Sequence, residues 1–155
     1  MARITRMRVE GLRELDRALG ELPKATGKNV LRRTLRKAGE PIMKEWAART
    51  PVLTGKLQKS VATGTKLSRR QRKGHRKQST VEIFVGAGAL AQATMQEFGT
   101  AHHAPQPAAR PAWDNNQVKA LEIVKTELGG EIEAARKRLA RKAAREAAKI
   151  GAKLK

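Results

Sequence analysis

Three closely spaced prolines limit what this chain can fold into more than any other feature of its sequence. Pro105, Pro107 and Pro111 each fix φ and remove a backbone donor, so their segment is extended and forms no inner strand. Gly99 precedes them and suits a turn with positive φ. Pro111 fits the first turn of a helix. The order predicted is a strand, a glycine turn, a stiff connector and a helix start.

A stiff connector costs less entropy to order than a flexible one. The segment is therefore well suited to insert into a neighbouring subunit or a partner. We predict that this contact involves the residues around the glycine turn and the helix start: Glu97, Phe98, Gly99, Thr100, Pro107, Arg110 and Pro111.

The composition predicts one small domain with a modest core. The chain has 155 residues and no tyrosine. It has no cysteine, so disulfides and thiolate metal sites are excluded. Burial against copies of itself is expected to supplement the small core. No apolar run approaches the roughly 20 residues that span a bilayer, and the N-terminus lacks the apolar centre of a signal peptide. We expect a soluble protein that is made in the cytoplasm.

The formal net charge of +20 predicts an anionic partner, which is a nucleic acid, an acidic protein surface or an anionic membrane. Residues 66–77 contain seven cations and no acid. Their pattern has no apolar period and predicts a mobile hairpin loop, whose exposed cations either contact DNA or an acidic partner or are simply solvated. These cations are Lys66, Arg69, Arg70, Arg72, Lys73, Arg76 and Lys77.

Helical spacing of apolar residues predicts helices at 11–22, 24–49 and 111–128. Pro41 is expected to kink the second helix near residue 38. Gly129 and Gly130 are expected to end the third helix, and 131–155 forms a separate basic helix that is marginal when alone. Trp46 and Trp113 fall on apolar stripes and are expected in the core. The face of the last helix is mostly alanine, which disfavours insertion into a membrane surface.

The strand signals are shorter. Residues 2–9 fit a strand loosely, 57–65 suggest one after a turn, and 81–86 is the clearest, with a central place in its sheet. Residues 89–98 fit either a strand or a short helix. The predicted fold class is α+β: a small antiparallel sheet packed against two or three helices, with a long basic C-terminal helix.

No catalytic, cofactor or metal site can be assembled from the sequence. His102 and His103 are adjacent in an extended segment and point to opposite sides, so we interpret them as loop residues rather than zinc ligands. Glu97 lacks the companions of a general base. We expect it to form a salt bridge to Arg110 or a hydrogen bond that fixes the Gly99 turn. The sequence predicts a protein without enzymatic activity.

An ordered set of short motifs resembles a known family. The set is Ala47-Ala48-Arg49-Thr50-Pro51, Thr54-Gly55-x-Leu57-x-x-Ser60, Val85-Gly86, Glu97-Phe98-Gly99-Thr100 and Pro107-Ala108-x-Arg110-Pro111-Ala112. Together these resemble the HK97 gp10-like family of tailed-bacteriophage proteins, described as tail-completion, neck or head–tail joining proteins. The resemblance covers residues of about 8 to 128. We therefore divide the chain into a domain at 1–128 and a basic helical extension at 129–155.

The resemblance implies a structural virion protein that forms a ring, typically of six copies, at the head-proximal end of the tail. Its implied partners are itself, the tail tube or tail terminator protein, the head-connector or head-completion proteins, and genomic DNA in the channel, with no membrane. Its implied location is the virion, after assembly in the host cytoplasm. The alternative is a basic protein that binds nucleic acid without sequence preference.

Overall fold

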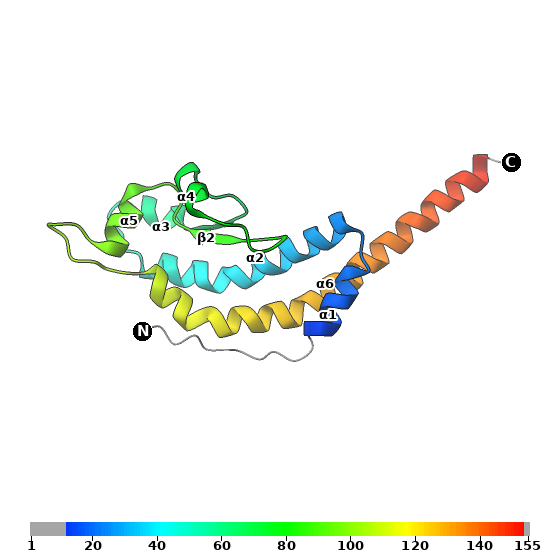
Figure 1. The fold of residues 1–155 in the computed structure, drawn as a ribbon, viewed down its shortest axis with the longest axis horizontal. Coiled ribbons are helices and arrows are strands. Elements are labelled where there is room, and N and C mark those ends of the chain that lie inside the picture. The colour runs from blue at the N-terminus through cyan, green and yellow to red at the C-terminus, as the bar shows by residue number, and fades with distance from the viewer. Residues whose placement is uncertain (1–11, 154–155) are drawn as a thin grey trace.

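The computed structural model describes residues 12–153, so the strand expected at 2–9 lies outside the described residues. It contains two long helices side by side, with a small sheet and short helices over one end (Figure 1). The α+β class predicted from the sequence is confirmed. The elements are α1 (Leu12–Gly20), α2 (Lys24–Arg49), α3 (Lys56–Ser60), β1 (Ala62–Gly64), α4 (Arg69–Gly74), β2 (Phe84–Gly86), α5 (Ala91–Phe98) and α6 (Ala109–Lys153).

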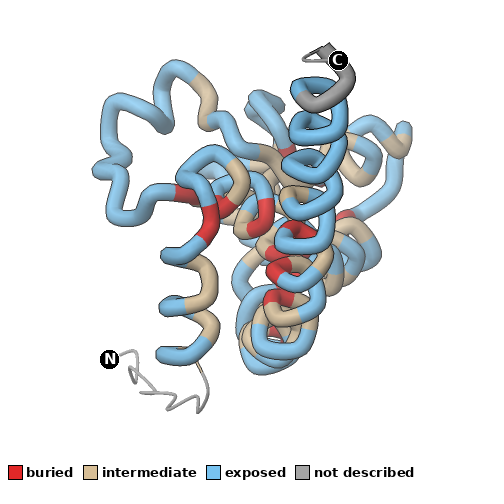
Figure 2. Tube along the Cα trace, turned by 90° about the vertical axis from the view of Figure 1, so that its right-hand side faces the viewer, coloured by how far each residue is buried: buried red, intermediate tan, exposed pale blue. Residues whose placement is uncertain are grey.

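Helices α2 and α6 pack against each other in opposite directions. The ammonium of Lys37 lies 2.6 Å from the carboxylate of Glu127, and the guanidinium of Arg33 lies 2.8 Å from that of Glu131. Between the helices, Val30 and Ile132 are almost completely buried, which gives the pair an apolar seam. Figure 2 shows that the buried residues follow the inner side of this pair.

Helix α1 covers one end of the pair. Its residues Leu15 and Leu19 pack against the buried cluster of Leu22, Val30, Leu128, Ile132 and Ala135. The apolar spacing had predicted both this helix and α2, and both predictions are confirmed. Pro41 lies inside α2, and the kink expected there stays a prediction. Thr50 ends α2, since its hydroxyl and its N–H both donate to the carbonyl of Trp46, at 2.8 and 3.1 Å.

The sheet consists of β1 and β2, which pair antiparallel with Thr63 opposite Val85. It lies directly on α2 at Gly39, where a Cβ atom would be only 3.2 Å from a methyl group of each of these two residues. A glycine therefore allows the close approach. Each strand has the other as its only partner in the described chain, so the central place expected for 81–86 is wrong. Leu57 belongs to α3 rather than to the strand expected at 57–65.

Helix α6 runs without a break through Gly129 and Gly130, so the helix end expected there is wrong. Two interior glycines cost about 2 kcal/mol in helix propensity. Burial of Leu128 and Ile132 on either side of them offsets that cost, because both side chains join the core with α1 and α2. The helix thus crosses the boundary that we placed between 1–128 and 129–155, and that division stays a prediction.

We predict that Gly130→Ala stabilises the protein by about 0.5 to 1 kcal/mol, because alanine is the better helix former. A Cβ atom at this position would meet no described neighbour within 4 Å. The free energy of unfolding in urea measures the effect. Gly39→Ala is the contrasting variant, since its added methyl group presses on the sheet. A loss of stability in Gly130→Ala would show that the helix is interrupted there.

Candidate interface at the proline-rich arm

Helix α5, rather than a strand, carries Met95 and Phe98, so the strand in the predicted order is wrong and the helical alternative for 89–98 is confirmed. Good helix formers such as Ala91 and Met95 fill the segment. It ends as predicted at Gly99, whose φ of 76° is positive. A Cβ atom at Gly99 would lie 2.8 Å from the carbonyl oxygen of His103. Only glycine fits this turn without moving the chain behind it.

Residues 99–107, which we call the arm, fold back on themselves and project from one end of the molecule (Figure 1). The N–H of Thr100 donates to the carbonyl of His103 at 2.9 Å, and the reverse bond measures 3.4 Å. At the base of the arm, the N–H of Gln106 donates to the carbonyl of Gln96 at 2.8 Å. The side chains of Gln96 and Gln106 also pair, at 2.6 Å. Hydrogen bonds at tip and base, together with the prolines, define one shape for the arm.

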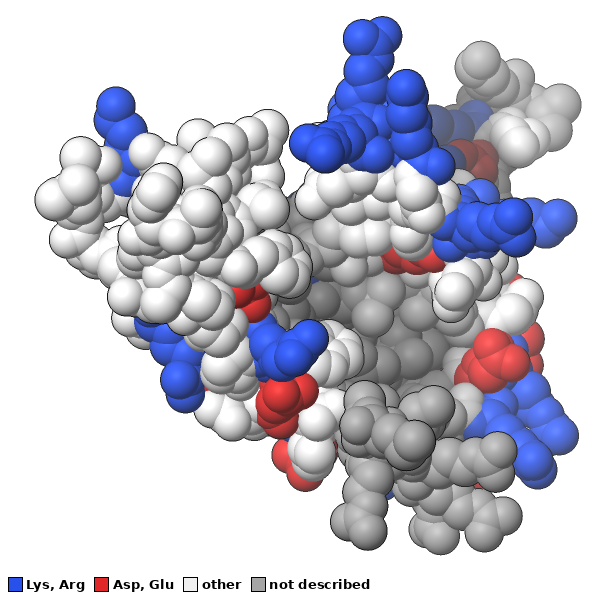
Figure 3. Space-filling view, turned by 60° about the vertical axis from the view of Figure 1, so that its left-hand side comes forward, with Lys and Arg blue, Asp and Glu red and all other residues white. Residues whose placement is uncertain are grey.

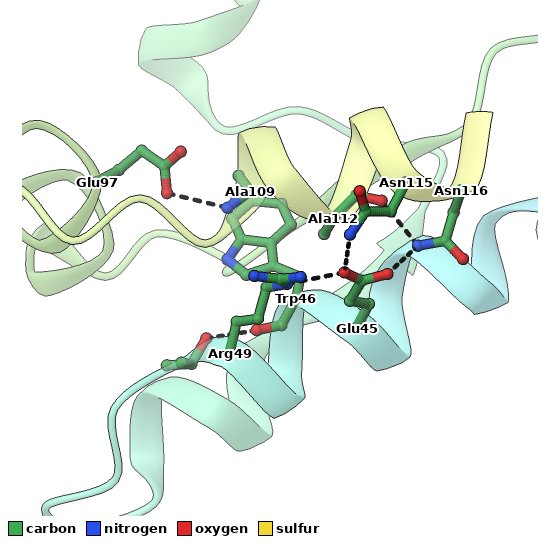
Figure 4. A network of polar contacts seen from close by, with 9 residues as sticks. Glu45, Trp46, Arg49, Glu97, Ala109, Ala112, Asn115 and Asn116 are labelled. Carbon is green, nitrogen blue, oxygen red and sulfur yellow. Dashed lines mark hydrogen bonds and ion pairs between the residues drawn. The ribbon is translucent and has the colours of Figure 1, made fainter.

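Glu97 attaches the arm to α6. Its carboxylate accepts hydrogen bonds from the backbone N–H groups of Ala108, Ala109 and Arg110, at 2.8, 3.0 and 3.3 Å. Ala109 and Arg110 begin the first turn of α6, and Ala108 directly precedes it. The N–H groups at the start of a helix have no acceptor within the helix. The negative charge also suits the positive end of the helix dipole. Glu97 on α5 therefore caps the start of α6 (Figure 4). It accepts the backbone N–H of Arg110 and does not form the expected salt bridge to the Arg110 side chain.

A second carboxylate, that of Glu45, ties α2 to the beginning of α6 (Figure 4). It accepts from the Asn115 amide at 2.7 Å, from the Arg49 guanidinium at 2.8 Å and from the Asn116 amide. These bonds hold the pKa of the Glu45 carboxyl below its usual range, with Asn115 the largest cause, then Arg49 and Asn116. Sequence reasoning missed this contact. Two adjacent asparagines inside a helix, where they are poor helix formers, were the available signal.

The end of the molecule that carries the arm exposes large apolar side chains. Phe98 is 75% exposed, and Leu53, in the loop before α3, is 97% exposed. Residues 51–55 and the side of α5 with Gln92 and Gln96 line a groove of about 310 Å³. Trp113, near the start of α6, is 54% exposed, so its expected place in the core is wrong. Exposed apolar side chains of this size are typical of surfaces that bind another protein.

The other predicted interface residues surround this end. Thr100 lies in the hydrogen-bonded turn, and Pro107 is exposed where the arm meets α6. Arg110 is exposed and Pro111 is partly buried in the first turn of α6, as its lack of an N–H predicted. His102 is exposed on the arm. The described chain contains no cluster of three or more His, Cys, Asp or Glu residues that could hold a metal ion.

The seven predicted cations of 66–77 are all exposed. Lys and Arg side chains gather at the top of Figure 3, and Figure 1 shows α4 in the upper part of the molecule. The segment connects the antiparallel strands β1 and β2, as the predicted hairpin does, but part of it is the helix α4 and not loop. A capping box begins this helix: Ser68 accepts from the N–H of Gln71, and Gln71 accepts from the N–H of Ser68 at 3.1 Å. The Ser-x-x-Gln pattern was the signal in the sequence.

A carboxylate also anchors the end of this basic segment. His75 Nε2 lies 2.8 Å from the carboxylate of Glu82, which accepts the N–H groups of Gln78 and Ser79 as well. The bond to His75 and then those from the backbone hold the pKa of Glu82 below its usual range. The edge of the His75 ring also packs on Phe84 of β2. The cations therefore extend from a segment whose helix is capped at its start and whose His75 is tied to Glu82 and Phe84.

A comparison with protein-family models identifies the family of this chain. Residues 13–99 match the HK97-gp10_like family, described as "Bacteriophage HK97-gp10, putative tail-component". The match spans more than half of the chain, which therefore belongs to this family, as the resemblance of its motifs predicted. Comparisons with curated proteins and with solved structures gave no match.

Membership makes the protein a structural component of the phage tail and hence of the virion, where it contacts other tail proteins. The matched region ends at Gly99, so the rest of the arm and α6 lie beyond it. Among the described residues no helix combines the length and the apolar character needed to span a membrane.

We predict that Glu97→Ala lowers the free energy of unfolding by about 1 to 2 kcal/mol, because it leaves N–H groups of the first turn of α6 without acceptors. Urea unfolding followed by circular dichroism measures this change. Glu122→Ala, which removes an exposed carboxylate from the middle of α6, is the matched control. Equal stability of the two variants would show that the cap contributes nothing.

The lowered pKa of Glu45 predicts a dependence of stability on pH. Since its pKa is lower in the folded chain, the ionised carboxylate stabilises the fold above the unfolded value of about 4.3, and this contribution is lost as pH falls through the folded value. Between about pH 6 and about pH 3 the wild type should therefore lose more stability than Glu45→Gln. Urea unfolding at each pH tests this. Identical pH profiles would contradict it.

Proposed function

We propose that this tail component forms a closed ring at the head-proximal end of the tail. There it joins the tail tube to the head connector, and the DNA channel passes through it. The observation that carries the proposal is Phe98, a large exposed apolar side chain at the root of an arm that hydrogen bonds hold in one shape. A surface prepared in this way binds with little loss of conformational entropy.

Two different apolar surfaces at this end of the chain support a ring. One is Phe98 with Met95 on α5, and the other is the groove beside the exposed Leu53. A contact in which a protuberance on one copy enters a groove on the next is heterologous, and it closes into a ring when the rotation allows. The proposed interface has residues 97–100 with Pro107, Arg110 and Pro111 on one copy, and the groove beside Leu53 on the next.

The cations of 66–77 suit a position where DNA or an acidic partner passes. Phosphate contacts from Lys and Arg need no base recognition and weaken with salt. No aromatic residue is interleaved with these cations, so base stacking is not part of the proposal. We further propose that the protein performs no chemistry, and that its partners are its own copies, the tail tube or terminator protein and the head-connector proteins.

We predict that the wild type gives a discrete oligomer in light scattering, alone or on purified tail tubes, and that Phe98→Asp abolishes it. A charge at this position has to be desolvated when the surfaces meet. The matched control replaces His102 and His103 by alanine, which changes the arm without changing its root. Equal oligomer yields for the two variants would contradict the proposed interface.

The alternative is a basic protein that acts alone on nucleic acid, which the net charge of +20 favours. It predicts a monomer or dimer that binds any duplex with a steep dependence on salt. A monomer both in solution and with tail tubes would support this alternative and reject the ring.

A further inference from the structure

Within residues 12–153, the end of α6 packs against no other element. Leu139 is the last residue of α6 that packs against the core cluster, and every residue from 140 to 150 is exposed. In Figure 1 this part of the helix extends beyond α1, away from the rest of the molecule. A segment of this length is marginal as an isolated helix. Here the docked part of α6 supplies the nucleus, and the frequent alanines propagate the helix.

Five cations lie on one side of this helix end. At about 100° per residue, their positions fall within an arc of about 100° and extend over about 16 Å of the helix axis. We call them the cationic stripe: Arg138, Arg141, Lys142, Arg145 and Lys149. The opposite side carries small residues, such as Ala143 and Ala147. Glu146 lies at the edge of the stripe, 3.8 Å from Lys142.

This arrangement is unfavourable for a helix that stays in water. Like charges three and four residues apart on a helix repel each other, and the stripe contains several such pairs, including Arg138 with Arg141 and Arg141 with Arg145. A partner that presents closely spaced negative charge removes this repulsion. A nucleic-acid duplex carries about one negative charge per 3.4 Å along each strand, which is close to the spacing of five cations over about 16 Å of helix.

We propose that the cationic stripe binds double-stranded nucleic acid through its phosphates, without sequence preference. Protein partners are recognised mainly through buried aromatic and apolar anchors. The stripe has none, and Ile150 is the one large apolar side chain among residues 140–150. An alanine face is also too small for strong insertion into a membrane. The inference concerns a segment beyond the matched family region, and it does not depend on the proposed ring.

The test is binding of a duplex of about 30 base pairs and arbitrary sequence, measured by fluorescence anisotropy at several salt concentrations. One variant replaces the five stripe residues by glutamine. The matched control replaces five exposed lysines elsewhere, Lys24, Lys28, Lys56, Lys119 and Lys125, so that both lose the same charge. Because the five stripe residues are exposed, circular dichroism should show both variants folded. Light scattering reports the oligomeric state of each sample separately.

We expect the stripe variant to bind at least about tenfold more weakly at moderate salt, with the slope of log affinity against log salt reduced by about 4. The control should keep its slope within about 1. Equal losses in the two variants would show that only bulk charge matters and would overturn the proposal, as would an unchanged stripe variant. If poly-glutamate displaces the duplex at an equal concentration of negative charge, the proposal is overturned, and an acidic protein becomes the partner that the stripe binds. If no oligomer forms while the two slopes differ, the ring fails and this inference stands.

Discussion

The antiparallel contact of α2 with α6 is the interaction on which the rest of the structure depends. Val30 and Ile132 are buried between the two helices, and Lys37 with Glu127 joins their outer edges. Among residues 12–153, neither helix has a second large surface against which to bury its apolar side, because the sheet there is only two short strands. The contact also explains how two interior glycines are tolerated in α6. Burial on both sides of Gly129 and Gly130 outweighs their poor propensity.

Two carboxylates connect the helix pair to the arm, and neither contact could be predicted from neighbouring residues in the sequence. Glu45 joins α2 to the asparagines near the start of α6, and Glu97 joins the end of α5 to the first N–H groups of the same helix. The arm lies between α5 and α6, so fixing both of its ends fixes its direction. A phage tail component built in this way presents Phe98 and the arm as one preformed surface. The cations of 66–77 and those of the cationic stripe lie outside this surface.

Local signals in the sequence predicted the local features well. The bounds of α2 follow from the prolines at 23 and 51, and the Gly99 turn follows from its neighbours. What failed needed distant contacts. Helix propensity alone predicts that α6 ends at Gly129 and Gly130. The helix continues because Leu128 and Ile132 beside them are buried in the core. The many cations of 66–77 led to a loop prediction although Ser68 begins a capping box. The apolar spacing around Trp113 predicted a buried side chain, but that side chain is exposed. Glu97 was expected to have a structural role. The sequence could not show that its carboxylate accepts the N–H groups at the start of α6, because this contact forms only when the arm folds back.

We propose that a rigid arm rooted on this helix pair delivers an apolar surface to another copy of the same chain. Photo-cross-linking in assembled particles tests it most directly, with a photo-reactive phenylalanine analogue at position 98. We expect a cross-linked dimer of this chain, and mass spectrometry should place the second cross-linked site in the segment around Leu53. Cross-links that join position 98 only to other tail proteins, or to none, would contradict it.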